Sequence, residues 1–198
     1  RSIYKGIGRA YESFTNFIGW DATCAGKTMG LAPYGKFYGE SVTLFDVDEN
    51  GAVASRLEGK YDFAAIDFVK KNHLNNLENV LYKKDAAADV ASFVQFHTEK
   101  AISKLVEVLT KKYHTRNVCL GGGVALNAVT NQKLLDNNIV DRLFIPPFPC
   151  DTGQCVGNVL AFLAEKGIVI REHLPNAYFG ATYTTEQIED MLFKKQTH

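Results

Sequence analysis

Residues Asn117–Asn127 read NVCLGGGVALN: a short apolar run, then three successive glycines, then the first turn of a helical pattern. The apolar run predicts a buried strand, and we expect the glycines to open a helix that continues to about Leu135. A second strand, Arg142–Pro146, precedes a proline-rich loop and a helix that begins at Asp151 and is closed by Gly167. This order of strands and helices predicts an α/β fold with parallel strands.

Two helices are predicted upstream of this stretch. Residues 10–18 place aromatic side chains at helical spacing, and Gly19 can end that helix. A longer helix is expected to begin at an Asp85 N-cap and to run to about Lys112. It carries an apolar stripe in which His97 is interpreted as a core or interface residue.

The rest of the chain is less regular. Residues 25–39 hold four glycines and one proline, which predicts a loop. Ser41–Val47 and Ala52–Leu57 are predicted to pair as a hairpin across the polar turn between them. Near the end of the chain, Thr184 and Gln187 form a capping-box pair that opens a last short helix.

Composition limits the function. The chain has 198 residues, with 22 Lys and Arg against 22 Asp and Glu. A net charge of zero argues against a broad nucleic-acid or anionic-membrane surface, and no apolar run is long enough to predict a membrane span. Four scattered cysteines predict reduced, mostly buried thiols in a cytoplasmic protein. The start at Arg1, without Met or an apolar leader, is expected of a piece of a longer protein.

The glycines at 121–123 are the first candidate for chemistry. Without side chains, they let a ligand rest against backbone N–H groups at the positive end of a helix. The dinucleotide-binding pattern G-x-G-x-x-G fails, because Leu126 stands where its third glycine should be. A nucleotide-contacting turn is favoured, and a tight strand-to-helix turn remains the structural alternative.

Two charged residues are further candidates. Asp21–Thr28, DATCAGKT, resembles a phosphate-binding P-loop, but it lacks the first glycine and the preceding strand. Lys27 is then either a phosphate-directed charge or a solvated lysine. Asp151 is either a helix N-cap or a ligand for a metal or a magnesium nucleotide, and one carboxylate cannot hold a metal alone. No pattern of a catalytic nucleophile or of paired metal-binding histidines is present.

Three segments together resemble a known family. They are GKTMGLAPYG at 26–35, LGGGVALNAVTN at 120–131 followed by Lys133–Leu135, and PPFPCDTGQCVG at 146–157. In sequence, order and spacing they are similar to the O-carbamoyltransferases of nodulation and antibiotic tailoring. The resemblance covers nearly the whole chain.

The resemblance implies a ribonuclease-H-like lobe of the actin/hexokinase-type ATPases, with a mixed sheet and flanking helices. Residues 1–170 would be the second lobe of the N-terminal ATPase-like domain. Residues 171–198 would be a linker and the start of the C-terminal carbamoyltransferase domain. Such enzymes use ATP, carbamoyl phosphate and a divalent metal, iron or magnesium, and pass the carbamoyl group through a carbamoyl-adenylate to a hydroxyl of a small molecule.

The resemblance also assigns roles to residues. Gly121, Gly122, Gly123 and Asn127 correspond to the nucleotide-binding turn of the second lobe, and Asp151 to its metal- or phosphate-directed aspartate. Lys27 is a candidate nucleotide-binding residue whose role in the connecting loop is undetermined. The full-length protein is expected to be an enzyme that binds no nucleic acid or membrane and can form a homodimer, whereas the isolated chain is expected to be inactive.

Two departures from the family affect these expectations. The paired metal histidines of the family's first lobe are missing from this chain, and Cys150 and Thr152 flank Asp151 where the family often has small residues. The alternative functions are another ATPase of the same superfold, such as a sugar kinase or a threonylcarbamoyl-transfer protein, and a non-catalytic binding or interaction lobe.

Overall fold

The computed structural model of the chain describes residues 6–36, 41–59, 63–78, 86–170, 178 and 180–196. The chain divides into two compact units, Arg1–Cys155 and Val156–His198. The predicted α/β class is confirmed, but the strands within the described residues form two separate two-stranded sheets where one mixed sheet was expected. The predicted domain boundary at residue 170 stays a prediction.

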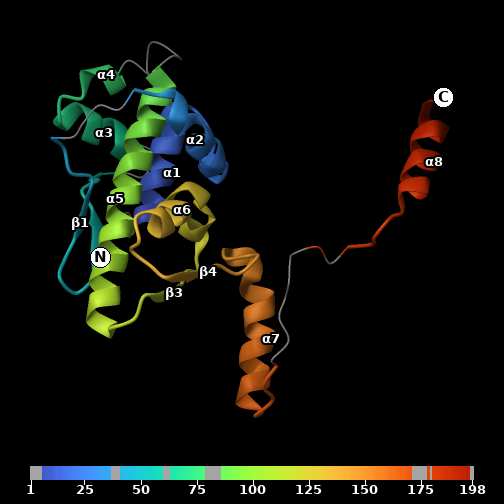
Figure 1. Ribbon diagram of the computed structural model, residues 1–198. Helices are drawn as coiled ribbons and strands as arrows, with labels where there is room; N and C mark the ends of the chain where they lie inside the picture. Colours follow the sequence, from blue (N-terminus) through green and yellow to red (C-terminus); the bar gives the residue numbers. More distant parts are fainter. Residues whose placement is uncertain are drawn as a thin grey trace. The chain divides into compact units, whose positions relative to one another are not determined.

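The first unit is built around one long helix, α5 (Ala87–Tyr113), which runs through its middle in Figure 1. The predicted apolar stripe packs against the neighbouring helices and β1; it is buried as far as Ala101 and half-buried beyond it, and His97, 4% exposed, lies in the core as expected. The expected N-cap of this helix, Asp85, lies outside the described residues. The helices packed on or near α5 include α1 (Ile7–Ile18), α2 (Ala25–Leu31), α3 (Ala64–Lys71) and α4 (Asn75–Glu78).

The aromatic residues of α1 form the main core. Phe14 is fully buried, and its ring lies 5.6 Å from that of Phe93 and 6.4 Å from that of Phe68, measured between centroids. Burial of side chains of this size is the largest favourable contribution to folding. Gly19 ends α1 as predicted, with a φ of 101° that disfavours other residues.

The glycine-rich segment at 25–39 is not the predicted loop over its described part. Two 3-10 turns, η1 (Ala22–Cys24) and η2 (Ala32–Tyr34), flank the helix α2. Thr28 is fully buried, and its hydroxyl lies 2.9 Å from that of Thr15 on α1. Packing of this face against α1 and α5 outweighs the helix penalty of about 1 kcal/mol for each interior glycine.

The predicted hairpin is confirmed, with strands shorter than expected. β1 (Phe45–Val47) pairs antiparallel with β2 (Val53–Ser55). The Asp48 carboxylate accepts hydrogen bonds from the backbone N–H groups of Asn50 and Ala52, both at 2.8 Å. The turn chemistry read from the sequence therefore sets the register.

The second sheet is the parallel pair predicted from the opening stretch. β3 (Asn117–Cys119) pairs with β4 (Arg142–Phe144). A small core of Ile102, Val106, Leu134 and Val140 underlies it. The predicted continuous helix after the glycines is instead divided at Asn127 into a 3-10 turn, η5 (Gly123–Leu126), and a helix, α6 (Ala128–Asp136).

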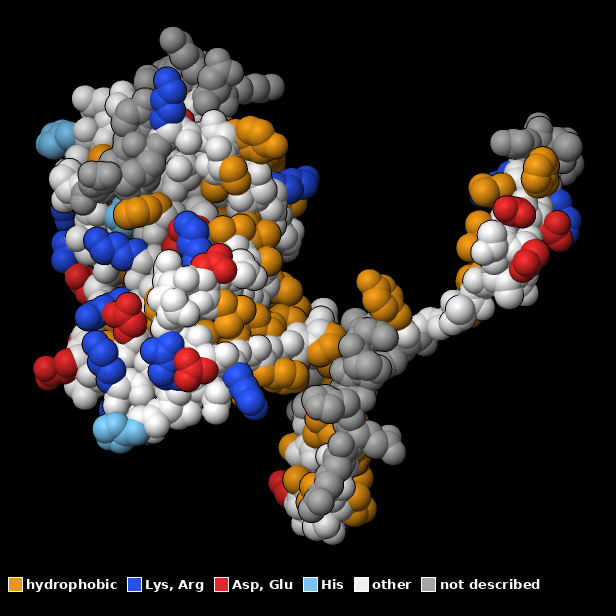
Figure 2. Space-filling model, in the orientation of Figure 1, with side chains coloured by type: hydrophobic (Ala, Val, Ile, Leu, Met, Phe, Trp, Pro, Cys, Tyr) orange, Lys and Arg blue, Asp and Glu red, His pale blue; other side chains and the backbone are white. Residues whose placement is uncertain are grey.

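The cysteines correct one expectation. All four are free thiols, but none is buried: Cys119 and Cys155 are exposed, and Cys24 and Cys150 are half-buried. Cys119 lies on a strand whose alternate side chains point away from the small core. Cys24 lies in a 3-10 turn, Cys150 precedes another, and Cys155 lies in the first turn of a helix. Charged side chains of both signs are interspersed on the face of the first unit seen in Figure 2.

Three elements complete the described chain: η6 (Asp151–Gly153), α7 (Gln154–Glu165) and α8 (Thr185–Gln196). Asp151 begins the 3-10 turn that leads into α7, close to the predicted helix start, and Gly167 follows the end of α7 as predicted. The Thr184–Gln187 capping box forms in both directions, at 2.9 and 3.3 Å. None of the described helices combines the length and the apolar character needed to cross a bilayer.

Candidate functional site

The glycine turn and Asp151 lie at the same edge of the parallel sheet. β3 and β4 run in the same direction, with Cys119 opposite Phe144 at their carboxyl ends. The Gly122 N–H donates to the Pro149 carbonyl at 2.7 Å, which joins the turn after β3 to the loop after β4. Asp151 follows two residues later. Ligands of open α/β sheets bind at this edge.

The three glycines leave open space beside the backbone. A Cβ atom added at Gly121, Gly122 or Gly123 would meet no described atom within 4 Å, and all three residues are exposed. Gly122 has a φ of 93° and a ψ of 164°, a conformation that is essentially restricted to glycine. At Gly121 and Gly123 neither the backbone nor a neighbouring side chain excludes alanine, which is the situation expected where a ligand approaches the backbone.

Asp151 does not act as the N-cap that was one of its two interpretations. The N-cap position of η6 is occupied by Cys150, which makes no capping hydrogen bond with its side chain. The Asp151 side chain is exposed, and no hydrogen bond or ion pair to it exists in the described ranges. The carboxylate is therefore available to a ligand from solvent.

The pKa of the Cys150 thiol, next to Asp151 in the sequence, is lowered. The Thr152 hydroxyl lies 3.2 Å from the Cys150 sulfur and, together with the Thr152 backbone, lowers the pKa of that thiol from its ordinary value. Cys155 donates to the Thr152 carbonyl at 3.5 Å. Both contacts lie in a solvent-exposed turn, so they constrain the local geometry more than they contribute to stability.

Lys27 is not brought to this edge by any described contact. It lies exposed on α2, whose buried Thr28 faces α1 and α5. The segment is also no P-loop, because the helix α1 precedes it and Asp21 caps η1 by accepting from the Thr23 N–H at 2.9 Å. The candidate residues thus separate into one group at the sheet edge and one lysine on another element.

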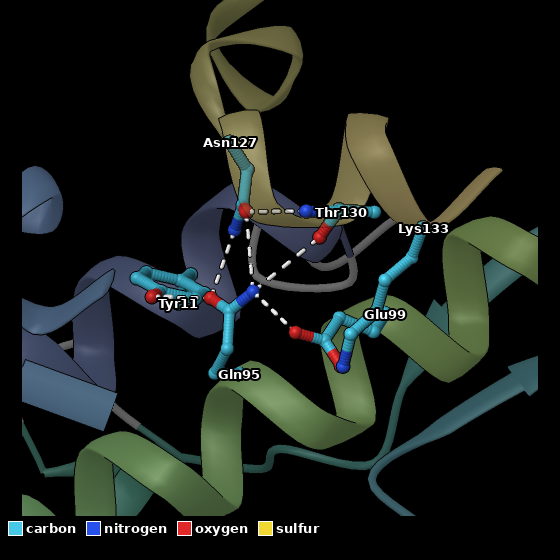
Figure 3. A network of polar contacts seen from close by, with 6 residues as sticks. All are labelled: Tyr11, Gln95, Glu99, Asn127, Thr130 and Lys133. Carbon is cyan, nitrogen blue, oxygen red and sulfur yellow. Dashed lines mark hydrogen bonds and ion pairs between the residues drawn. The ribbon is translucent and has the colours of Figure 1, made fainter. Parts of the chain in front are cut away.

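Asn127 faces inward, as Figure 3 shows. It is 8% exposed, and its side-chain oxygen accepts from the Thr130 N–H at 3.0 Å, which caps α6. The same oxygen accepts from Gln95 at 3.1 Å, and its amide nitrogen donates to Gln95 at 2.9 Å. Asn127 is committed to holding the turn, whereas the glycines face solvent.

Sequence reasoning missed the polar network around Asn127. Gln95 on α5 also accepts from the Tyr11 hydroxyl at 2.8 Å and donates to Glu99 at 2.8 Å. Lys133 on α6 pairs with the other oxygen of Glu99 at 2.5 Å. The signal was present as Gln95 and Glu99, two polar residues four apart on a long amphipathic helix, both of which the structure buries.

Burial of this network has an electrostatic consequence. Tyr11 is 6% exposed, and burial together with the negative charge of Glu99 raises the pKa of its hydroxyl well above the ordinary range. Tyr11 is therefore a hydrogen-bond donor throughout the physiological pH range, and the network is held together by fixed donors and acceptors.

A metal centre is not formed by the described residues alone. No group of three or more His, Cys, Asp or Glu side chains able to hold a metal occurs within those ranges. At the sheet edge Asp151 supplies a single carboxylate, so a metal bound there would need further ligands, such as the phosphate oxygens of a nucleotide.

Comparison with known proteins identifies the family of this chain. The family described as Carbamoyltransferase N-terminus matches residues 2–160, and the chain belongs to that family. The family predicted from three sequence segments is thereby confirmed. All three segments lie within the matched residues, whereas the assignment to a second lobe stays a prediction.

Relatives of this chain are about three times as long. An uncharacterized protein of Synechocystis sp. is 29% identical over 94% of this chain and 32% of the relative. Nodulation protein NolO of Bradyrhizobium diazoefficiens is 25% identical over 95% of this chain and 34% of the relative. Nodulation protein U of Sinorhizobium fredii is 24% identical over 85% of this chain and 34% of the relative. The chain thus spans about a third of the length of these relatives.

Proposed function

We propose that this chain is part of a carbamoyltransferase, in which it forms one side of an ATP-binding site within a ribonuclease-H-like lobe. The whole enzyme would transfer the carbamoyl group of carbamoyl phosphate to a hydroxyl of a small molecule. Family membership supports carbamoyl transfer. The observation that carries the nucleotide site is the meeting of an open glycine turn and an uncommitted carboxylate at one sheet edge.

In this proposal the backbone performs the binding. The N–H groups of Gly121 and Gly123 would donate to phosphate oxygens, whereas that of Gly122 is held by the Pro149 carbonyl. Asp151 would face a divalent metal, which supplies neutralisation of phosphate charge when it is bound. Because the sequence carries no motif of a catalytic nucleophile, this chain would contribute positioning and electrostatic stabilisation.

Lys27 has a separate place in the proposal. Its exposure on α2 leaves its ammonium group free to reach a phosphate presented by another part of the full-length protein. Lys27→Gln should then weaken ATP binding, whereas a solvated lysine predicts no change. Dimerisation and a cytoplasmic location stay predictions.

Alanine at Gly123 tests the site. The substitution meets no described atom, so it should leave folding intact while it obstructs a phosphate. We expect ATP affinity of the full-length protein, measured by isothermal titration with magnesium present, to fall about tenfold or more, the loss expected when charge-assisted hydrogen bonds are broken. Gly30→Ala, at an equally open position on α2, is the matched control and should leave affinity unchanged.

The binding measurement, together with an assay of phosphate release from carbamoyl phosphate, separates the alternative functions. If wild-type protein binds ATP but releases no phosphate from carbamoyl phosphate in the presence of candidate hydroxyl acceptors, another ATPase of the superfold is favoured. If wild-type protein has no affinity for ATP, the nucleotide site is wrong and a non-catalytic lobe is favoured. Equal ATP affinity of wild type and Gly123→Ala would mean that ATP binds elsewhere and not at the turn.

A further inference from the structure

We infer that Gln95 is a positioning residue for the glycine turn, acting through Asn127. The inference rests on the proposed function for the purpose of the turn. The positioning itself is carried by the polar network of Tyr11, Gln95, Glu99, Asn127, Thr130 and Lys133, drawn in Figure 3.

The donors and acceptors of this network have only one consistent arrangement. The Glu99 carboxylate can only accept, so the Gln95 atom 2.8 Å from it must be the amide nitrogen. The Gln95 oxygen then faces Asn127 and must receive the Asn127 amide nitrogen, at 2.9 Å. This places the Asn127 oxygen where the Thr130 N–H donates to it, at 3.0 Å. Each assignment follows from the one before it, starting from a carboxylate.

Gln95 uses its full bonding capacity. Its oxygen accepts from Tyr11 and Asn127, and its nitrogen donates to Glu99 and to the Asn127 oxygen. The side chain is 5% exposed, so water cannot replace a missing partner. A reciprocal pair of amide hydrogen bonds fixes both the position and the rotation of Asn127.

Asn127 transmits this constraint to the glycines. Its backbone N–H donates to the Val124 carbonyl at 3.0 Å, which closes η5, and the Ala125 N–H donates to the Gly122 carbonyl at 3.0 Å. The Gly122 N–H in turn donates to Pro149. An unbroken series of hydrogen bonds therefore joins Gln95 in the core to the exposed turn and to the loop that carries Asp151.

The test measures amide hydrogen exchange by NMR in the whole 198-residue chain, without nucleotide. In Gln95→Leu, protection at Gly122, Ala125 and Asn127 should fall about tenfold relative to protection within α1, because local opening replaces a fixed turn. The matched control is Thr28→Val, which removes the buried hydroxyl contact between α2 and Thr15 of α1 and touches no hydrogen bond of Gln95. It should lower protection in α1 and at the turn by the same factor.

Gln95→Glu separates positioning from a general structural role, because it should make amide protection at the turn depend on pH. The new carboxyl group would face Tyr11 of α1, Glu99 of α5 and Lys133 of α6 as its titratable neighbours. Beside the Glu99 carboxylate and out of water its pKa is raised. Its protonated form can again donate to Glu99. Protection of the turn in this variant should therefore rise as the pH falls from 8 to 5, whereas the wild-type value should stay level.

The exchange measurements decide the inference. If Gln95→Leu lowers protection of the turn no more than that of α1, or if Gln95→Glu shows no pH dependence, Gln95 does not position the turn. If Gln95→Leu does not fold, Tyr11→Phe removes one of the hydrogen bonds to Gln95 and should loosen the turn in the same direction by a smaller factor. If the full-length protein fails to bind ATP, the proposed function fails, and the exchange data still decide the positioning.

Discussion

Two glycine-rich segments of this chain have opposite structures. Residues 26–35 form a helix and a 3-10 turn packed on the core, whereas residues 121–123 form an open turn at a sheet edge. A Cβ atom at Gly35 would lie 1.9 Å from the Ala88 carbonyl oxygen, but one at Gly123 would meet nothing. The same residue type therefore serves close packing in one place and exposure of the backbone in the other.

The largest effect is expected where packing demands glycine. Gly35→Ala would force backbone against backbone, and we expect it to lower the free energy of unfolding by about 3 kcal/mol or more. The melting temperature should fall by roughly 10 °C for a chain of this size. Gly26→Ala, at an open position in the same segment, is the control. If Gly35→Ala unfolds at the same denaturant concentration as the wild type, Gly35 does not pack closely against the Ala88 carbonyl.

A smaller effect is expected within the open turn, from conformation and not from contact. Gly122→Ala should lower the free energy of unfolding by about 1–3 kcal/mol, because a side chain strains a backbone with φ at 93°. Gly121→Ala should change it by less than about 0.5 kcal/mol, as a surface substitution without a special role does. Urea unfolding of both variants measures the difference. Equal losses would mean that the turn is packed and not open.

A gain of stability is expected in the helical segment. Gly30→Ala places a better helix former at an exposed position of α2 with no neighbour in its way. The free energy of unfolding should rise by up to about 1 kcal/mol. Calorimetric melting of the variant beside the wild type measures this gain, and a loss in its place would show that glycine at this position serves the packing of α2.

The smallest effect is a pH dependence at the start of the same segment. The Thr23 hydroxyl and then the Thr23 N–H hold the pKa of Asp21 below its ordinary value. A lowered pKa contributes stability that is present above about pH 3.9, the ordinary value for Asp, and is lost as the pH falls through the folded value. The stability difference between wild type and Asp21→Asn should therefore shrink between pH 5 and pH 2. If the stability difference stays constant over this pH range, the Asp21 carboxylate does not stabilise the start of η1.

Local pattern was sufficient to predict most helices, both strand pairs and the turn at Asp48. It failed at residues 25–31, because the burial of Thr28 against α1 is a contact between segments that no local window contains. It failed again at Asn127, where a continuous helix was expected and the side chain instead caps a new one. At Thr28 the contact is with Thr15, and at Asn127 it is with Gln95. In both places a contact with a residue distant in the sequence outweighed local propensity.

The candidate site was predictable in part: its exposed residues could be read from the sequence, but the buried residue that supports them could not. The glycines and Asp151 follow two neighbouring parallel strands, so their meeting at one edge followed from strand order. Gln95 was not identified, because its partners Tyr11 and Asn127 are 84 and 32 residues away in the sequence. A polar residue in an apolar stripe signals a buried partner but does not name it.

The sequence alone determined the class of fold, the family and the two segments that form the sheet edge, because these depend on local periodicity and on short patterns of residue types. Only the tertiary structure decided which glycines face open space and which face a carbonyl oxygen. It also decided that Asn127 is turned inward onto Gln95. These outcomes depend on distances between segments far apart in the chain, and the energies of close contact and of buried hydrogen bonds exist only once those segments have come together.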